Sequence, residues 1–203
     1  MKQSLGNPVN YSILSRPDER GITLIMVMII LIVVSLLGAG GAQIALMSER
    51  SARNDRDQQV AWQAAEEGLV DAEIDMWNTA STRRSIFDGQ GLVDFPATGC
   101  GTSGNSKGLC ASVVTGKPAW LTQDLTDTSA GAGTTAVGAF TGRIFEAGGP
   151  GVTPAKVPRY IIEPVIAQIG SKSGPPEIWY RVTAMGFGPR ADIQSVVQML
   201  YRN

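Results

Sequence analysis

An uninterrupted apolar run near the N-terminus constrains this chain more than any other feature. From Ile22 to Met47 no residue is charged, and the run is interrupted only by three glycines and three uncharged polar side chains. As an α-helix the run is about 39 Å long, which exceeds the roughly 30 Å hydrocarbon core of a bilayer. We therefore expect residues 22–47 to form a helix that lies in a membrane or among similar helices.

The flanks of this run allow three interpretations. A secretory signal has a shorter apolar core and a small-residue cleavage site, which Ala39-Gly40-Gly41 imitates. An uncleaved membrane anchor is the second interpretation. The third is cleavage between Gly21 and Ile22, which would remove residues 1–21 as a leader and keep the apolar helix at the mature N-terminus.

Basic residues precede the run and predict its orientation. Lys2, Arg16 and Arg20 all lie on its N-terminal side. The positive-inside rule then keeps the N-terminus in the cytoplasm and sends the rest of the chain across the membrane.

The helical pattern continues beyond the apolar run. Residues 48–77 contain no proline and one glycine. Small and apolar residues recur there at helical spacing, which predicts an amphipathic half, residues 48–78, continuous with the apolar half. The predicted stripe consists of Val60, Ala64, Ala65, Gly68, Leu69, Ala72 and Met76.

Composition narrows the classes of function. The chain has a net charge of -1 and no histidine. The balanced charge argues against a nucleic-acid-binding face, and the missing histidine removes the commonest general base and zinc ligand. Its two cysteines, Cys100 and Cys110, would form a disulfide in an exported chain and stay free in a reducing cytosol.

Residues 79–203 are expected to form an exported, β-rich head. Three segments rich in β-branched and aromatic residues, 160–169, 178–187 and 193–201, predict an antiparallel sheet. Leu109–Thr115 is also β-prone, and the Gly/Ala/Thr-rich stretch Thr128–Gly142 reads as a surface loop. The predicted fold is α+β, with a long N-terminal helix packed on a small antiparallel sheet.

Three stretches of this chain resemble the PilX-type minor pilins of type IV pili. They are SERSARNDRDQQVAWQAAEEGLVDAE (48–73) directly after the apolar run, PRYIIE (158–163), and WYRVTAMGFGPRADIQSVVQMLYR (179–202). The resemblance implies a pilin-like roll. It also implies that a prepilin peptidase cuts after Gly21 and methylates the amine of Ile22.

Met26 departs from the general pilin pattern. Major pilins carry a glutamate at the fifth mature position, whereas the fifth residue counted from Ile22 here is Met26. A carboxylate in a membrane is costly unless it is paired. A subunit that enters a filament first has no earlier neighbour to pair with, so Met26 suggests a position at or near the tip. The plain alternative is an apolar side chain that faces lipid.

Other motifs predict little chemistry. GCGTSG (99–104) matches a dinucleotide-binding pattern only formally, because no strand precedes it. Asp124 and Asp127 lack the ligand spacing of an EF-hand. We expect no metal, no cofactor and no catalytic site. The acidic residues of the helix are expected to form a solvated face or to meet a partner: Glu66, Glu67, Asp71, Glu73 and Asp75. Two tryptophans, Trp62 and Trp77, are expected to pack the helix on the sheet.

The expected function is therefore assembly. The resemblance implies an inner-membrane minor pilin with a periplasmic head that helps prime a type IV pilus and reaches its tip, with adhesion and twitching motility as consequences. The implied partners are other minor pilins, the major pilin, prepilin peptidase and a PilY-type tip adhesin, with no direct contact to nucleic acid. The alternatives are a GspK-type tip pseudopilin of type II secretion and a plain membrane-anchored periplasmic protein.

Overall fold

The structure is a computed structural model that describes residues 20–79, 81–88, 92–167 and 177–202. The chain divides into two compact units, Met1–Ser51 and Ala52–Asn203. One helix, α1 (Arg20–Trp77), begins in the first unit and ends in the second. The leader predicted for residues 1–21 lies almost entirely outside the described residues.

Within the second unit, α1 contacts the sheet through its smallest residues. Ala61, Ala64, Ala65 and Ala72 are all almost fully buried. A Cβ added to Gly186 would lie 2.2 Å from the backbone nitrogen of Ala65, so glycine is required there for the helix to approach the strand. The predicted small-residue stripe is thus the face that packs.

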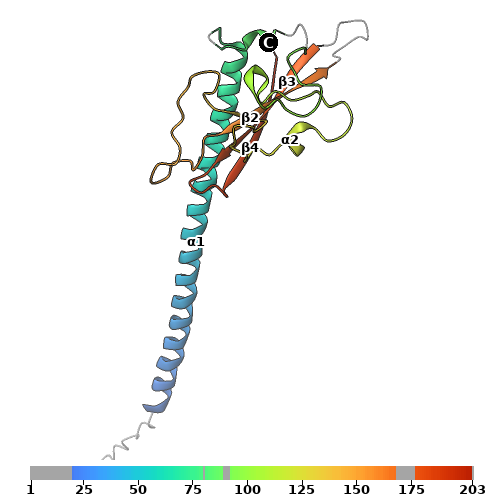
Figure 1. The fold of residues 1–203 in the computed structure, drawn as a ribbon. Helices are drawn as coiled ribbons and strands as arrows, with labels where there is room; N and C mark the ends of the chain where they lie inside the picture. The colour runs from blue at the N-terminus through green and yellow to red at the C-terminus, as the bar shows by residue number, and fades with distance from the viewer. Residues whose placement is uncertain (1–19, 80, 89–91, 168–176, 203) are drawn as a thin grey trace, which may run out of the picture. The chain divides into compact units, whose positions relative to one another are not determined.

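The head contains a four-stranded antiparallel sheet in the order β1-β2-β3-β4. Its strands are β1 (Thr135–Ala136), β2 (Arg159–Ala167), β3 (Glu177–Phe187) and β4 (Gln194–Tyr201). The three strands expected from the sequence are confirmed within a few residues, although residues 168–176 lie outside the description. Figure 1 shows β2, β3 and β4 beside the C-terminal part of α1.

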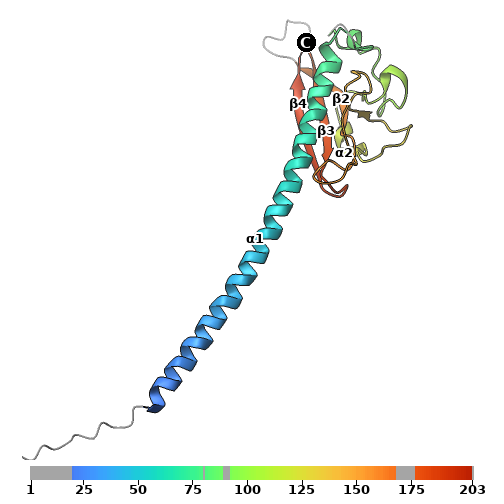
Figure 2. The same ribbon diagram turned by 90° about the vertical axis from the view of Figure 1, so that its left-hand side faces the viewer.

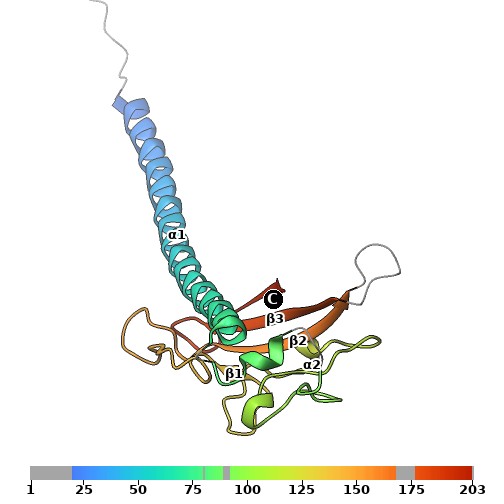
Figure 3. The same cartoon turned by 90° about the horizontal axis from the view of Figure 1, so that it is seen from above.

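Each face of the sheet carries its own apolar cluster. On the face that α1 covers, Tyr160, Val182 and Val197 pack with Ala72 and Met76 of the helix. On the opposite face, Ile161 packs with Cys110 and Ala119. Figure 2 shows α1 in front of the strands, and Figure 3 shows α2 (Ala119–Thr122) on the other side of the sheet from α1. The α+β prediction is therefore confirmed.

Two predictions about the loops need correction. Thr128–Gly142 is not simply a surface loop, because Ala132, Thr134 and Thr135 are buried and Thr135 pairs with Tyr160 of β2. Small side chains allow this segment to approach the sheet closely. Within the β-prone stretch 109–115, only isolated bridges form, at Leu109 and Cys110. The described connections also include two 3₁₀ helices, η1 (Arg84–Phe87) and η2 (Gly104–Ser106).

Candidate functional site

The apolar half of α1 is the largest candidate interaction surface. Its large apolar side chains are exposed all the way from Ile22 to Met47. Within the described chain, the helix Gly21–Trp77 is long and apolar enough to cross a membrane. An exposed apolar surface of this extent is unstable in water, so lipid or other apolar helices must cover it.

The residues singled out for processing lie at the start of this surface. Gly21 and Ile22 belong to the first turn of α1, which begins two residues earlier than expected, at Arg20. Met26 is 63% exposed and lies on the same helix. Gly21 has open space where a side chain would be. The first unit thus presents both the proposed cleavage position and Met26 on one accessible helix.

The end of α1 is fastened to the head by a buried arginine. Arg83 and Asp75 have fully buried side chains and form a salt bridge, with Arg83 Nε donating to Asp75 Oδ2 over 2.7 Å. Ser81 and Tyr160 also donate their hydroxyl hydrogens to Asp75, at 2.8 and 3.1 Å. Burial raises the pKa of Tyr160 well above 10.0, and the Asp75 carboxylate reinforces the shift. A single carboxylate therefore joins the helix to β2 and to the segment after the helix.

The other side of the Arg83 guanidinium reaches the cysteine-containing loop. Arg83 Nη1 donates to the backbone carbonyl oxygens of Lys107 and Asn105 over 2.6 and 3.2 Å. Its Cζ lies 3.7 Å from the centre of the Phe140 ring. Arg83 thus connects three segments that are distant in sequence, which makes it the main polar contact inside the head.

Asp71, one helical turn before Asp75, anchors the segment after β1. Its carboxylate accepts hydrogen bonds from the Gly138 backbone N–H at 2.9 Å and from the Thr141 hydroxyl at 2.5 Å. Burial raises the pKa of Asp71 above 3.8, against the lowering effects of these two donors and of Arg143. The chain beyond β1 is therefore held to α1 by a buried acid.

These contacts correct two interpretations. Asp71 and Asp75 were expected on a solvated or partner-facing side of the helix, but both are fully buried against their own head. Trp62 and Trp77 were expected to pack between helix and sheet, but they are 46% and 52% exposed. The reason is their place on the helix, because both lie outside the stripe of positions buried against the sheet, which includes Ala61, Ala65 and Met76.

A disulfide organises the loop on the opposite face of the sheet. Cys100 and Cys110 are bonded, as expected for an exported chain. Next to this loop, the buried Glu163 accepts a hydrogen bond from the Ala119 backbone N–H at 2.7 Å and pairs with Arg181 at 3.1 Å. The disulfide loop and α2 are consequently fixed against β2.

The acidic pair considered as a calcium ligand is occupied by local turns. Asp124 accepts hydrogen bonds from the N–H and hydroxyl of Thr126, and Asp127 from those of Ser129. Among the described residues, no group of three or more histidine, cysteine, aspartate or glutamate side chains could hold a metal ion.

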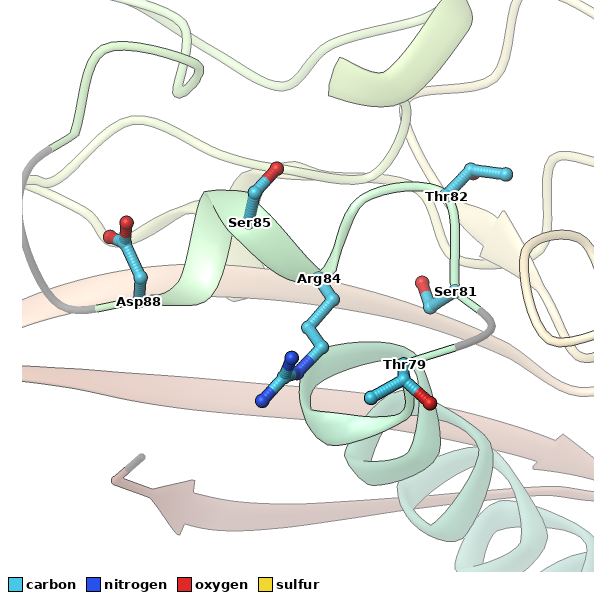
Figure 4. Close-up of a pocket in the computed structure, with 6 residues that line it drawn as sticks. All are labelled: Thr79, Ser81, Thr82, Arg84, Ser85 and Asp88. Carbon is cyan, nitrogen blue, oxygen red and sulfur yellow. The ribbon is translucent and has the colours of Figure 1, made fainter.

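A shallow depression lies beside the end of α1. Its lining consists of hydroxyl-bearing residues, one arginine and one aspartate: Thr79, Ser81, Thr82, Arg84, Ser85 and Asp88. Figure 4 shows Arg84 and Ser85 pointing to opposite sides of η1. The Ser81 hydroxyl already donates to Asp75. These polar groups do not converge on one point, so the depression offers no arrangement for activating a nucleophile.

An exposed apolar helix that continues as the packed helix of a small antiparallel sheet defines a pilin-like subunit. Two family models match the chain, the PilX N-terminal model at residues 20–70 and the model of the type IV pilus assembly protein PilX C-terminal region at residues 95–203. The chain therefore belongs to the PilX family of type IV pilus assembly proteins. No curated protein and no solved structure matches it significantly.

Proposed function

We propose that this chain is a minor pilin that helps to prime type IV pilus assembly and occupies the tip of the filament or a position near it. The observation that carries the proposal is the uncharged helical segment Ile22–Met47, whose large apolar side chains are exposed, in a chain that belongs to a pilus assembly family. Its role is binding rather than catalysis, since the helix can leave lipid for a bundle of similar helices.

Maturation is part of the proposal. Prepilin peptidase would remove residues 1–21 and methylate Ile22, leaving a charged amine at the end of an apolar helix. The mature chain would then have three parts: residues 22–47 in the membrane or filament core, residues 48–78 as the amphipathic half of the helix, and residues 79–203 as the periplasmic head. The Cys100–Cys110 disulfide supports an oxidising compartment for the head.

The proposed partners are the other minor pilins and the major pilin, with a PilY-type tip adhesin exposed by the same complex. Adhesion and twitching motility would follow from assembly. A tip pseudopilin of type II secretion is the second candidate, because it shares an apolar residue at the position of Met26. The head of roughly 125 residues leaves little room for the large insertion of the GspK type.

The tip position is tested by placing a carboxylate at the fifth mature position. Met26→Glu is compared with Met28→Glu, since both methionines are more than half exposed on the apolar helix. In cells whose own gene is deleted, we expect fewer surface pili when Met26→Glu is supplied than when Met28→Glu is supplied. When a labelled wild-type subunit is supplied instead, we expect the label only at filament ends. Normal initiation by Met26→Glu together with its incorporation along the whole filament would contradict the tip assignment.

A further inference from the structure

Strand β4 is an edge strand without the usual protection. It is the last strand in the order β1-β2-β3-β4 and runs for 8 residues from Gln194 to Tyr201. Its sequence, QSVVQMLY, contains no charged residue and no proline. Soluble proteins usually block such an edge with lysine, proline, a bulge or a covering segment, because exposed backbone groups recruit other strands.

The register identifies the backbone groups that face outward. Gly188 N–H donates to the Ile193 carbonyl, closing the β3–β4 hairpin, so odd-numbered residues of β4 direct their backbone groups toward β3. The N–H and C=O groups of Val196, Gln198 and Leu200 therefore point away from the sheet. Among residues whose positions the structure describes, none supplies a hydrogen-bond partner to these groups.

The opposite edge of the sheet is closed. Strand β1 pairs with the start of β2, and Ile162 exchanges backbone hydrogen bonds with Gly108 and Cys110 of the disulfide loop. Farther along β2 stands Pro164, which has the same parity as Ile162, so its missing N–H falls on this outer edge. The chain thus protects one edge by three means, whereas among the described residues the outer edge of β4 has one partner, the side-chain amide of Gln58, which donates to the Gln194 carbonyl at 3.3 Å.

The surface around the β4 edge is apolar and electrically balanced. Val196 and Leu200 are 46% and 61% exposed on the face that α1 does not cover. Two arginines adjoin this edge, and both are paired, Arg181 with Glu163 and Arg202 with Glu177. An occupant of this edge would need extended backbone groups and apolar side chains to pack on Val196 and Leu200, because the two arginines beside them already have carboxylate partners.

We propose that β4 accepts an extended, uncharged strand from a different pilus subunit, which adds to the sheet beside Val196, Gln198 and Leu200. The partner strand supplies alternating backbone donors and acceptors, and every second side chain packs on Val196 and Leu200. This inference rests on the proposed function, because it takes the partner to be another subunit of the pilus.

A proline substitution tests the backbone part of the proposal. Gln198→Pro removes an outward-facing N–H while leaving the β3–β4 ladder intact, and Gln198→Ala is the matched control, since both lose the side-chain hydrogen bond to Thr183. We expect Gln198→Pro, as a full-length disulfide-bonded protein in pilus-forming cells, to recover about tenfold less co-purified pilus subunit than Gln198→Ala. Equal recovery by both variants, or equal loss by both, would overturn strand addition.

Site-specific cross-linking identifies the occupant. A photoreactive residue at Leu200 is compared with one at Val114, an exposed loop position. We expect Leu200 alone to link to an extended segment of another pilus subunit, mapped by mass spectrometry of the linked peptides. Links to a helix, to a second copy of this chain or to no protein would each overturn the assignment. A mature N-terminus at Ile22 in the same sample shows that any such failure concerns the edge strand and not the pilin function.

Discussion

Removal of the Arg83 guanidinium should destabilise the head more than the loss of any exposed ion pair. Arg83 is fully buried and bridges Asp75 to the carbonyl oxygens of Lys107 and Asn105. Arg83→Met retains much of the apolar stem but leaves the buried Asp75 carboxylate without its cation. Asp75 would keep only the Ser81 and Tyr160 hydroxyl donors.

Breaking a buried ion pair by removing one partner costs about 3–5 kcal/mol, whereas an exposed pair contributes roughly 0–1 kcal/mol. We therefore expect Arg83→Met to lower the free energy of unfolding by about 3 kcal/mol. This is the lower end of the range, because two hydroxyl groups still donate hydrogen bonds to the Asp75 carboxylate. The matched control is Arg202→Met, which breaks the exposed pair with Glu177. The assay is urea denaturation of the full chain in detergent, monitored by tryptophan fluorescence, since all four tryptophans lie in the second unit, Ala52–Asn203.

A double-mutant cycle separates the pair from its surroundings. Asp75→Asn combined with Arg83→Met leaves no uncompensated buried charge at this pair. The double variant should therefore lose less stability than the sum of the two single variants. If Arg83→Met is no more destabilising than Arg202→Met, or if the two single losses simply add, the buried pair does not hold the head together in the way described.

Three further predictions concern the acid, the helix contact and the disulfide. Because burial raises the pKa of Asp71 above 3.8, the folded state binds a proton at this carboxyl more tightly than the unfolded state does. The free energy of unfolding should therefore fall as the pH rises from 3.8 through the raised pKa. Asp71→Asn should lack this fall when urea midpoints are measured over a series of pH values. Gly186→Ala should destabilise the head by at least about 1–3 kcal/mol, because the added Cβ meets the α1 backbone. The control Gly131→Ala, which has open space around the added Cβ, should leave the stability unchanged. Equal denaturation curves for the two variants would contradict the close contact between Gly186 and α1. Replacing Cys100 and Cys110 by serine should cost about 2–3 kcal/mol, checked by the same denaturation, and an unchanged midpoint would contradict a stabilising role.

The secondary structure was largely predictable because its signals are local. The apolar and amphipathic halves of α1 follow from helical periodicity, and β2, β3 and β4 follow from β-branched runs separated by turns. Strand β1 was missed since it is only two residues long, Thr135–Ala136, in a segment of loop-like composition. Its burial depends on pairing with Tyr160, and local composition does not report such a contact.

The polar interior of the head could not be predicted for a related reason. Asp75 meets Tyr160 across 85 positions of sequence, and Asp71 meets Thr141 across 70. From the sequence alone, an aspartate beside apolar residues on a helix is equally compatible with a solvated boundary. One signal was available, because Asp71 and Asp75 lie one turn apart and adjoin the small-residue stripe at Ala72 and Met76.

The most direct test of the pilin assignment is the chemistry of the mature N-terminus. Intact-mass and N-terminal analysis would be made on membrane-extracted protein from cells with and without active prepilin peptidase. We expect a chain that begins at N-methylated Ile22 only when the peptidase is active, and an uncut leader otherwise. A chain that still begins at Met1 in both cells, or one cleaved near Ala42, would contradict the pilin account.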